Sequence, residues 1–334
     1  MLFDILTIFP DFFGTSDQGI FGHGVVARAL RTGLATARTH DLRAFTHDRH
    51  RTVDDRPFGG GEGMVLKPQP IYEALESLAL TPKSARDAAR AAGLPVKQTV
   101  ILLSAQGKRF TQATARRLAT LDRVVLICGR YEGVDERVSQ LFCDEELSIG
   151  DYVLSGGELA AAILLDATVR LLPGVLGHAD SSRFESFGEP DATPSSPEPC
   201  DPSPKPCHPS PKIYDPSPQI CDPSPQICHP SRSGGSASDT RDEPNEPSAS
   251  QQVPRSTNAA AGLLDYPHYT RPAEFLGLSI PEPLGNGDHL AIRRWRRHAA
   301  LAKTLANRPD LLATAPLSDD DREFLASLGY HPPA

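Results

Sequence analysis

The sequence has no apolar run long enough to cross a lipid bilayer, and its first residues lack the charged start and cleavage site of a signal peptide. Cysteine is also scarce. Of the six cysteines, only Cys128 and Cys143 lie outside a proline-rich repeat, so no disulfide framework is suggested. We therefore expect a cytoplasmic protein that does not enter a membrane, with one large or two modest domains in its 334 residues.

The sequence also has fewer basic than acidic side chains, 34 against 42, which gives a formal net charge of −8. Such a balance would argue against nucleic-acid binding if the charge were evenly spread, but it is not. The segment between Phe187 and Gly262 holds ten acidic and only five basic side chains. The remaining chain is closer to neutral, and its local basic patches decide which partners it can bind.

The most informative stretch runs from residue 129 to residue 157. It follows an apolar run at 124–127, whose lack of alternation is typical of a strand buried on both faces of a parallel sheet. The glycines at 129 and 133 then lie at the carboxyl end of a strand, where open α/β sheets bind ligands. Either glycine alone would suit an ordinary turn. Together with the second glycine loop at 148–157, they predict one pocket in which main-chain N–H and C=O groups form hydrogen bonds with a ligand.

Both halves of this stretch resemble the signature loops of a known family. Residues 128–137 read Cys-Gly-Arg-Tyr-Glu-Gly-Val-Asp-Glu-Arg, and residues 148–158 read Ser-Ile-Gly-Asp-Tyr-Val-Leu-Ser-Gly-Gly-Glu. They are similar to the loops of the bacterial tRNA (guanine-N1)-methyltransferases, the TrmD family, in the SPOUT class of S-adenosylmethionine enzymes. The match is long and nearly free of gaps.

This resemblance implies an α/β fold, in which a parallel sheet carries a SPOUT-type trefoil-knotted cofactor site and a small C-terminal helical domain follows. Three loops, at 102–106, 129–133 and 148–157, are expected to converge on S-adenosyl-L-methionine. The cofactor-binding residues that the resemblance implies are Leu102, Leu103, Ser104, Gly129, Tyr131, Glu132, Ile149, Gly150, Tyr152, Leu154, Gly156 and Gly157. The family also implies Mg2+, which no ligand spacing in the sequence supports.

A second candidate region is the stretch at 45–64, which is too polar and too rich in glycine for regular structure. Long ordered loops in compact domains are usually functional, although a plain solvated loop remains an alternative. His47 and His50 have no third ligand at a usual metal spacing, and the glycines lack the Gly-Lys-Ser/Thr ending of a phosphate-binding P-loop.

The resemblance covers this loop too and implies contact with tRNA and its target guanosine. Arginines such as Arg49, Arg51 and Arg56 can pair with phosphates, and a carboxylate can accept hydrogen bonds from the N1–H and N2–H2 edge of guanine. The candidate substrate-binding residues in the loop are Asp54, Asp55, Arg56 and Gly59.

Hydrophobic periodicity predicts the other elements of this part of the chain. Strands are expected at 2–9, at 99–103 and, as an edge strand, at 35–44. Helices are expected at 25–30, 70–80, 82–92 and 159–172. Thr111 is expected to cap a helix that runs to about residue 119, and residues 104–109 are expected to form the loop before it.

Residues 188–260 form a low-complexity segment that holds 17 of the 32 prolines. Its seven-residue units carry at least two prolines each, which excludes a coiled coil and predicts polyproline-like or disordered chain. Regularly spaced cysteines with His208 and His229 would suit a metal, but an unstructured repeat is the simpler interpretation. Because the family pattern resumes at Gly262, we divide the chain into a SPOUT methyltransferase domain at 1–187, an insert or linker at 188–260 and a helical tRNA-binding domain at 261–334.

The last segment contains a basic helix, expected from residue 287 to about residue 305. Its arginines come without an intervening acid, which is typical of a solvated face or of a surface that binds a nucleic-acid backbone. Since the resemblance covers this helix, Arg293 and Arg294 are candidate tRNA contacts. Trp295 is interpreted as a core residue.

The resemblance implies transfer of the methyl group of S-adenosylmethionine to N1 of a tRNA guanosine, the one at position 37 next to the anticodon. N1 of guanine carries a proton, so the reaction needs a base, and a cation should stabilise the charge that grows on O6. Glu185, which aligns with the family's aspartate through Ser186 and Phe187, is the candidate base, with Asp180 as its rival. Arg170, at the position of the family's functional arginine, is the candidate cation.

The resemblance further implies a homodimer with shared active sites. Two alternative functions stay open. One is a SPOUT RNA methyltransferase with a different target, and the other is a non-catalytic tRNA-binding protein. Methylation assays on tRNA with and without the target guanosine distinguish them.

Overall fold

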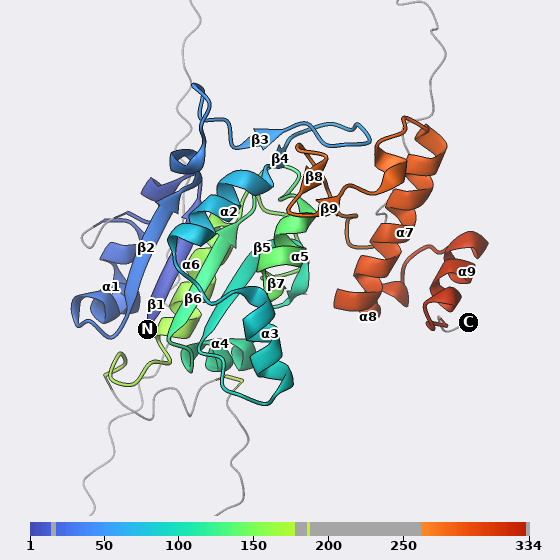
Figure 1. Cartoon of the computed structure of the whole chain (residues 1–334). Helices are drawn as coiled ribbons and strands as arrows, with labels where there is room; N and C mark the ends of the chain where they lie inside the picture. Colours follow the sequence, from blue (N-terminus) through green and yellow to red (C-terminus); the bar gives the residue numbers. More distant parts are fainter. Residues whose placement is uncertain (15–17, 178–185, 188–261, 332–334) are drawn as a thin grey trace, which may run out of the picture. The chain divides into compact units, whose positions relative to one another are not determined.

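A computed structural model of the chain describes residues 1–14, 18–177, 186–187 and 262–331 (Figure 1). Its central element is a five-stranded sheet with the strand order β2-β1-β6-β5-β7, in which every neighbouring pair is parallel. The expected α/β class with a parallel sheet is therefore confirmed. The strands are β1 (Leu2–Thr7), β2 (Thr36–Asp41), β5 (Gln98–Arg109), β6 (Arg123–Cys128) and β7 (Glu145–Ser148).

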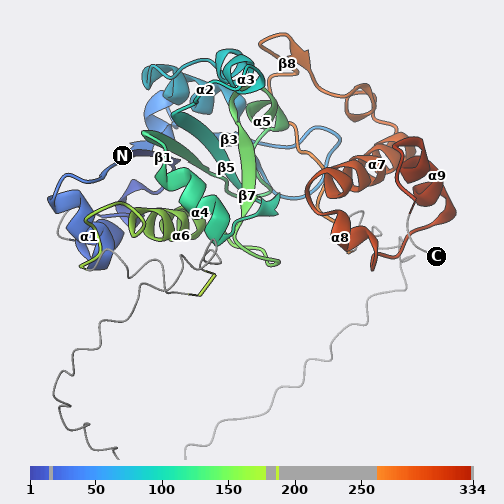
Figure 2. The ribbon, with the colours of Figure 1, turned by 90° about the horizontal axis from the view of Figure 1, so that it is seen from below.

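Alternate residues of the central strands face opposite sides of the sheet and fill two separate cores. Phe3, Ile5 and Leu126 belong to the core that includes residues of α1, α4 and α6, whereas Leu6 and Ile127 belong to the core that includes residues of α2 and α5. Figure 2 shows α1, α4 and α6 on one side of the sheet and α2 and α3 on the other. These helices are α1 (Gly24–Arg31), α2 (Pro68–Ser77), α3 (Lys83–Ala91), α4 (Gln112–Ala119), α5 (Glu136–Phe142) and α6 (Glu158–Val169).

The structure corrects the sequence expectations at two places. The loop expected at 104–109 is the end of β5, which leaves its pairing with β7 after Leu103 and pairs again at Lys108. Gly107 permits this close approach, since a Cβ there would lie 2.5 Å from the Leu147 nitrogen. Helix α6 ends at Val169 rather than at residue 172, because residues 171 and 172 form tight i→i+3 hydrogen bonds. The expected cap is confirmed, as the Thr111 hydroxyl accepts from the Thr114 nitrogen.

The polar loop contains almost no regular structure, as expected. The only strand within residues 45–64 is β3 (Asp54–Asp55), which pairs in an antiparallel arrangement with β4 (Val65–Leu66), directly after the loop. Short 3-10 helices occur at η1 (Pro10–Phe12), η2 (Ile20–Gly22) and η3 (Leu42–Phe45).

Residues after the proline-rich segment form a helical region that belongs to the same compact unit as the sheet. Leu301, Leu312 and Leu325 form its small core, and Trp295 lies half-buried beside Tyr269, as expected for a core residue. None of the helices in the described ranges is long and apolar enough to span a membrane. The elements here are β8 (Glu274–Phe275), β9 (Leu278–Ser279), η5 (Glu282–Leu284), α7 (His289–Asn307), α8 (Pro309–Leu312) and α9 (Asp319–Ser327).

Candidate active site

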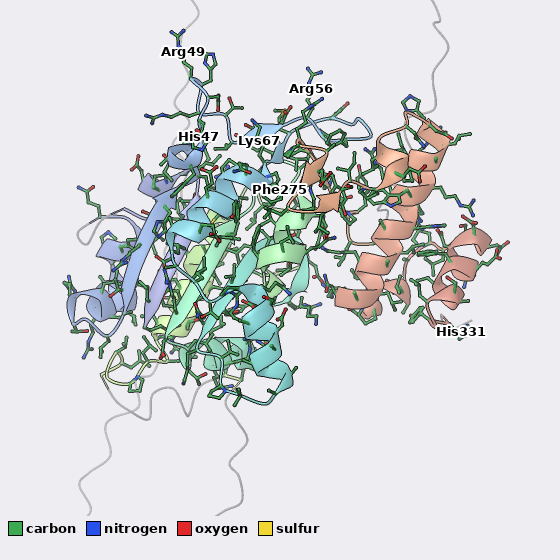
Figure 3. The ribbon with its side chains drawn as sticks, in the orientation of Figure 1. His47, Arg49, Arg56, Lys67, Phe275 and His331 are labelled. Atoms are coloured by element: carbon green, nitrogen blue, oxygen red, sulfur yellow. The ribbon has the colours of Figure 1, made fainter. Side chains whose placement is uncertain are left out.

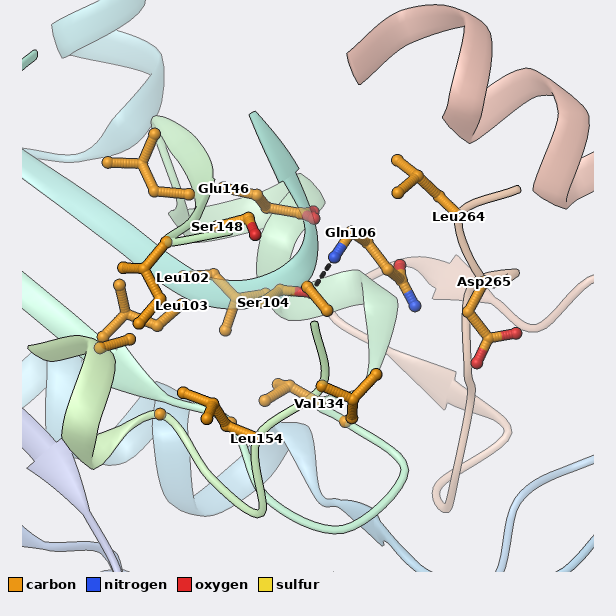
Figure 4. Close-up of a pocket in the computed structure, with 18 of the residues that line it drawn as sticks. Leu102, Leu103, Ser104, Gln106, Val134, Glu146, Ser148, Leu154, Leu264 and Asp265 are labelled. Carbon is orange, nitrogen blue, oxygen red and sulfur yellow. Dashed lines mark hydrogen bonds between the residues drawn. The ribbon is translucent and has the colours of Figure 1, made fainter. Parts of the chain in front are cut away.

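A cavity of about 650 Å³ lies where β6 and β7 end and β5 leaves its regular pairing (Figure 4). Three stretches of chain line it, at 102–106, 129–134 and 146–157. All twelve residues expected to bind the cofactor are among its lining residues. The structure therefore brings these residues together, and their binding of the cofactor stays a prediction.

The two glycine loops touch each other through the main chain at this cavity. The Gly157 nitrogen donates to the Gly129 oxygen at 2.9 Å, and Arg130 pairs with Gly156 in an isolated antiparallel bridge. A Cβ on Gly157 would lie 2.7 Å from the Cα atom of Cys128, so no other residue fits there without a backbone shift. Tyr131, the residue after these contacts, adopts a left-handed backbone with φ of 60°, a costly conformation that often marks a functional loop.

Glu158, the first residue of α6, connects the end of the second glycine loop to the first glycine loop. Its carboxylate is 2% exposed and accepts hydrogen bonds from the Thr7 hydroxyl at 2.7 Å and from Arg130 Nε at 3.1 Å. The Arg130 guanidinium also lies 4.4 Å from the centre of the Phe9 ring. A buried carboxylate with two donors is stabilised in place, so the end of β1, the first glycine loop and the start of α6 are fixed relative to one another.

Cys128, at the end of β6, is not a candidate nucleophile. Burial raises the pKa of its thiol well above the ordinary value, and the nearby Glu158 carboxylate raises it further. The thiol therefore stays protonated and acts as a small core group.

The cavity has another wall that sequence reasoning did not identify, formed by residues 262–265, His268, Arg308 and Leu311. Asn307 Nδ2 donates to the Gln106 oxygen at 2.8 Å, and Arg308 donates to the Asp151 carboxylate, with Arg308 NH2 lying 3.0 Å from Oδ2. These hydrogen bonds from Arg308 lower the pKa of Asp151. The only sequence signal for this wall is the return of the family pattern at Gly262.

Two acidic side chains that line the cavity share one lysine. Lys303 Nζ donates to Glu136 Oε1 at 3.0 Å and to Glu146 Oε1 at 2.9 Å. Burial raises the pKa of the Glu136 carboxyl even though Lys303 opposes the shift. The pair of carboxylates and the lysine join α5 and β7 to α7.

The predicted substrate loop has a mixed environment. The Asp55 carboxylate accepts from Arg271 NH1 at 3.1 Å, whereas Arg56 is exposed and, like Arg49, is directed away from the ribbon (Figure 3). Gly59 packs against the helical region, since a Cβ there would lie 2.9 Å from Leu284 Cδ2. Asp54 lies in β3, partly buried.

The candidate arginines of α7 differ in their exposure. Arg293 is exposed, and Arg294 forms only a surface ion pair with Asp320, at 3.3 Å. Arg296 instead donates to the Gly60 oxygen, and Arg297 pairs with the buried Asp321. The outer arginines 293 and 294 are therefore the ones accessible to a large partner.

Of the candidate catalytic residues, only Arg170 belongs to the part of the chain that the structure describes. Glu185 and its rival Asp180 fall outside the described residues. Arg170 is described and follows the last residue of α6, but it is not among the residues that line the cavity.

The described residues do not form a recognisable metal-binding site. They contain no group of three or more His, Cys, Asp or Glu side chains arranged to hold a metal ion. The Mg2+ implied by the family thus has no fitting ligand set there.

A parallel α/β sheet, with a cavity walled by glycine-rich main chain at its carboxyl edge, defines a protein that binds a small ligand of cofactor size. Comparison with known proteins gives the family. The chain belongs to the tRNA (guanine-1)-methyltransferase TrmD family, whose model matches residues 1–198 and 248–314. The family predicted from the two glycine loops is confirmed.

Several curated proteins resemble the chain over nearly its whole length. A tRNA (guanine-N(1)-)-methyltransferase of Koribacter versatilis is 47% identical over 328 residues, which cover 98% of this chain and 98% of that protein. Proteins of the same name from Heliobacterium modesticaldum and Geobacter metallireducens are 40% and 39% identical. Those alignments cover 98% of this chain and 90% and 98% of the two proteins.

Proposed function

We propose that this protein transfers the methyl group of S-adenosyl-L-methionine to N1 of guanosine 37 of tRNA. The observation that carries the proposal is the convergence of all twelve expected cofactor residues on one cavity. Membership of the TrmD family and the names of the similar proteins support the same reaction and the same substrate.

The cavity suits a cofactor of this size and kind. Its volume of about 650 Å³ falls within the range of ordinary small-molecule sites, and its lining includes Gly129, Gly156 and Gly157, which place no side chain between the main chain and a ligand. When bound, S-adenosylmethionine supplies an electrophilic methyl group. The family resemblance further supports a trefoil knot that threads the three lining loops.

The remaining chemistry falls to side chains of the protein. Glu185 takes the proton from N1, and Arg170 stabilises the negative charge that develops on O6. Asp54 and Asp55 hold the Watson–Crick edge of the guanine, which is turned out of its loop, while Arg56 and Gly59 contact the adjoining chain. Orientation matters greatly here, because the methyl group and N1 must meet in line.

The helical region provides further tRNA contacts. Arg293 and Arg294 are accessible on α7 and can neutralise phosphates, which position the tRNA without reading its sequence. On this view residues 1–187 form the SPOUT methyltransferase domain, residues 188–260 an insert, and residues 261–334 a helical tRNA-binding domain.

The active protein is a homodimer in which two chains share each active site. The exposed face of α6 supports this, because Leu159 and Ile163 are 50% and 46% exposed although the helix is apolar on nearly all sides. Such helices are normally buried, and residues four apart lie on one face. Phe9, also exposed, follows β1, whose Thr7 bonds to the start of α6. A second copy of the chain is the partner that would cover these side chains.

A methyl-transfer assay tests the function directly. The purified protein is given labelled S-adenosylmethionine and one tRNA transcript, beside a transcript with guanosine 37 replaced by adenosine. Transfer to the first transcript alone, located at N1 by mass spectrometry, is the expected result. Equal transfer to both transcripts would indicate a different target, and tRNA binding without transfer would indicate a non-catalytic role.

A further inference from the structure

One short segment after the proline-rich insert contacts both the residues that follow the predicted cofactor loop at 129–133 and the predicted substrate loop at 45–64. It comprises residues 268–271, His-Tyr-Thr-Arg, and is here called the strap. Its central residue, Thr270, has no solvent exposure.

On one side, the strap is joined to the chain that continues the first glycine loop into α5. The Thr270 nitrogen donates to Asp135 Oδ2 at 2.8 Å, and Arg137 NH2 donates to the Thr270 oxygen at 2.8 Å. The Glu136 nitrogen donates to the His268 oxygen at 2.9 Å. Asp135 and Arg137 are themselves fully buried and paired at 2.8 Å, so the strap is attached to a rigid polar core.

On the other side, the strap is joined to the predicted substrate loop. The Phe58 nitrogen donates to the Tyr269 oxygen at 2.8 Å, and the Thr270 hydroxyl donates to the Arg56 oxygen at 2.9 Å. Arg271 adds the exposed ion pair with Asp55. The main chain is thus tied to the strap at Arg56 and at Phe58.

Thr270 is the residue at which these two sets of contacts meet. Its main-chain groups bond to Asp135 and Arg137, and its hydroxyl bonds to Arg56. We propose that Thr270 is a positioning residue, whose hydroxyl holds the guanosine-binding loop in register with the cofactor cavity. This inference rests on the proposed function, because it takes tRNA as the molecule that the loop binds.

The chemistry of Thr270 allows a clean separation of its two roles. Thr270→Val keeps the shape and both main-chain bonds to the buried ion pair, and removes only the hydroxyl. Thr270→Ser restores the hydroxyl. Without the hydroxyl, the loop at 45–64 is less ordered in the free protein, so ordering it on tRNA binding costs more free energy. The hydrogen bonds that hold the cofactor cavity are unchanged.

The experiment compares wild type, Thr270→Val and Thr270→Ser with a control, Thr99→Val. Thr99 is also buried, but it lies at the start of β5 and its hydroxyl contacts Asp144, the residue before β7, so it lies away from the carboxyl ends of these strands. The dissociation constants of a tRNA transcript and of S-adenosylhomocysteine are measured for each protein, together with the melting temperature. Tryptic cleavage after Arg49 and Arg51, in the same loop, is timed in the absence of any ligand; Arg56 precedes Pro57 and is therefore not a trypsin site.

We expect Thr270→Val to weaken tRNA binding by roughly 3- to 10-fold, the effect of one hydrogen bond, and to speed cleavage of the loop. Its affinity for S-adenosylhomocysteine should stay within about twofold of wild type, and Thr270→Ser and Thr99→Val should behave as wild type. Unchanged cleavage in folded Thr270→Val, or equal losses of tRNA and S-adenosylhomocysteine binding, would overturn the inference. If Thr270→Val does not fold, Thr270→Ala is read in the same way. Failure of the proposed function is seen separately, as absent methyl transfer by the wild type.

Discussion

Glu158 and Arg170 lie at opposite ends of α6, with Glu158 beside the cofactor cavity and Arg170 just beyond the last turn. The helix has 12 residues, so at about 1.5 Å per residue the two positions are roughly 18 Å apart. That separation exceeds the reach of an arginine side chain. Within one chain Arg170 therefore does not reach the cavity next to Glu158, and in the homodimer that we propose it would act from the second chain.

Shared active sites predict complementation between inactive variants. One variant carries Gly129→Val, which damages the cavity, and the other carries Glu185→Gln. Each should be inactive alone. After mixing and refolding, half of the dimers should be mixed and should hold one intact site, so activity should return to about a quarter of wild type. Size-exclusion chromatography confirms that both variants dimerise. No recovery of activity in verified mixed dimers would contradict shared sites.

Glu185→Gln tests the general base. Glutamine keeps the size and hydrogen bonding of glutamate but cannot take a proton, so single-turnover methyl transfer should fall by about a hundredfold or more, with little change in cofactor affinity. Glutamate is one methylene longer than the family's aspartate, and a misplacement of about 1 Å can itself cost a hundredfold. A near-normal rate for Glu185→Gln, with loss of activity in Asp180→Asn, would move the role to Asp180.

Glu158→Ala should weaken cofactor binding by about tenfold, because Arg130 and Thr7 lose a buried charged acceptor and the two glycine loops lose their common support. Isothermal titration with S-adenosylhomocysteine measures the effect. Glu145→Ala is the matched control, since its ion pair with Arg117 is partly exposed and contributes less than a fully buried pair. Equal affinity in both variants would argue that the loops hold their positions without Glu158.

Asp4 gives the stability of the sheet a dependence on pH. Burial by itself raises the pKa of this carboxyl, but hydrogen bonds from His40 and Arg123 lower it below the ordinary value. A carboxyl with a lowered pKa in the folded state stabilises the protein above its unfolded pKa, and this contribution is lost as the pH falls through the folded pKa. Asp4→Asn should thus reduce the free energy of unfolding at pH 7 by about 2 kcal/mol.

The difference between wild type and Asp4→Asn should shrink as the pH is lowered below about 4. Urea unfolding at a series of pH values measures it. Asp87→Asn, on the surface of α3, serves as the control and should change stability much less. A difference that stays constant down to pH 2 would show that the Asp4 charge is not responsible.

Removal of residues 199–247 should leave catalysis intact. The family model matches the chain on both sides of these residues and skips them. The cost of closing a loop grows only with the logarithm of its length, roughly 0.6 kcal/mol per doubling, so a shorter connection should not harm folding. The deletion variant is compared with full-length protein in melting temperature and in tRNA methylation. Loss of methylation with an unchanged melting temperature would assign the insert a role in binding or assembly.

The sequence by itself determined the fold class and the family. The apolar run at 124–127 does not alternate, which required a strand covered on both faces, and the two glycine loops after it carried the resemblance to TrmD. These signals are local. Hydrophobic periodicity indicates which side of a helix or strand is buried, and a glycine loop indicates where the main chain is accessible. Neither pattern indicates which distant segment of the chain packs against that helix, strand or loop.

Only the tertiary structure decided the partners of these local elements. It brought residues 262–265, Arg308 and Leu311 to the cavity, and tied the strap to Asp135 and Arg56. It also divided the arginines of α7, which the sequence presents as one basic run, into inner residues bound to the protein and outer residues open to a partner. Contacts between residues more than a hundred positions apart depend on the path of the chain, and no local pattern records that path.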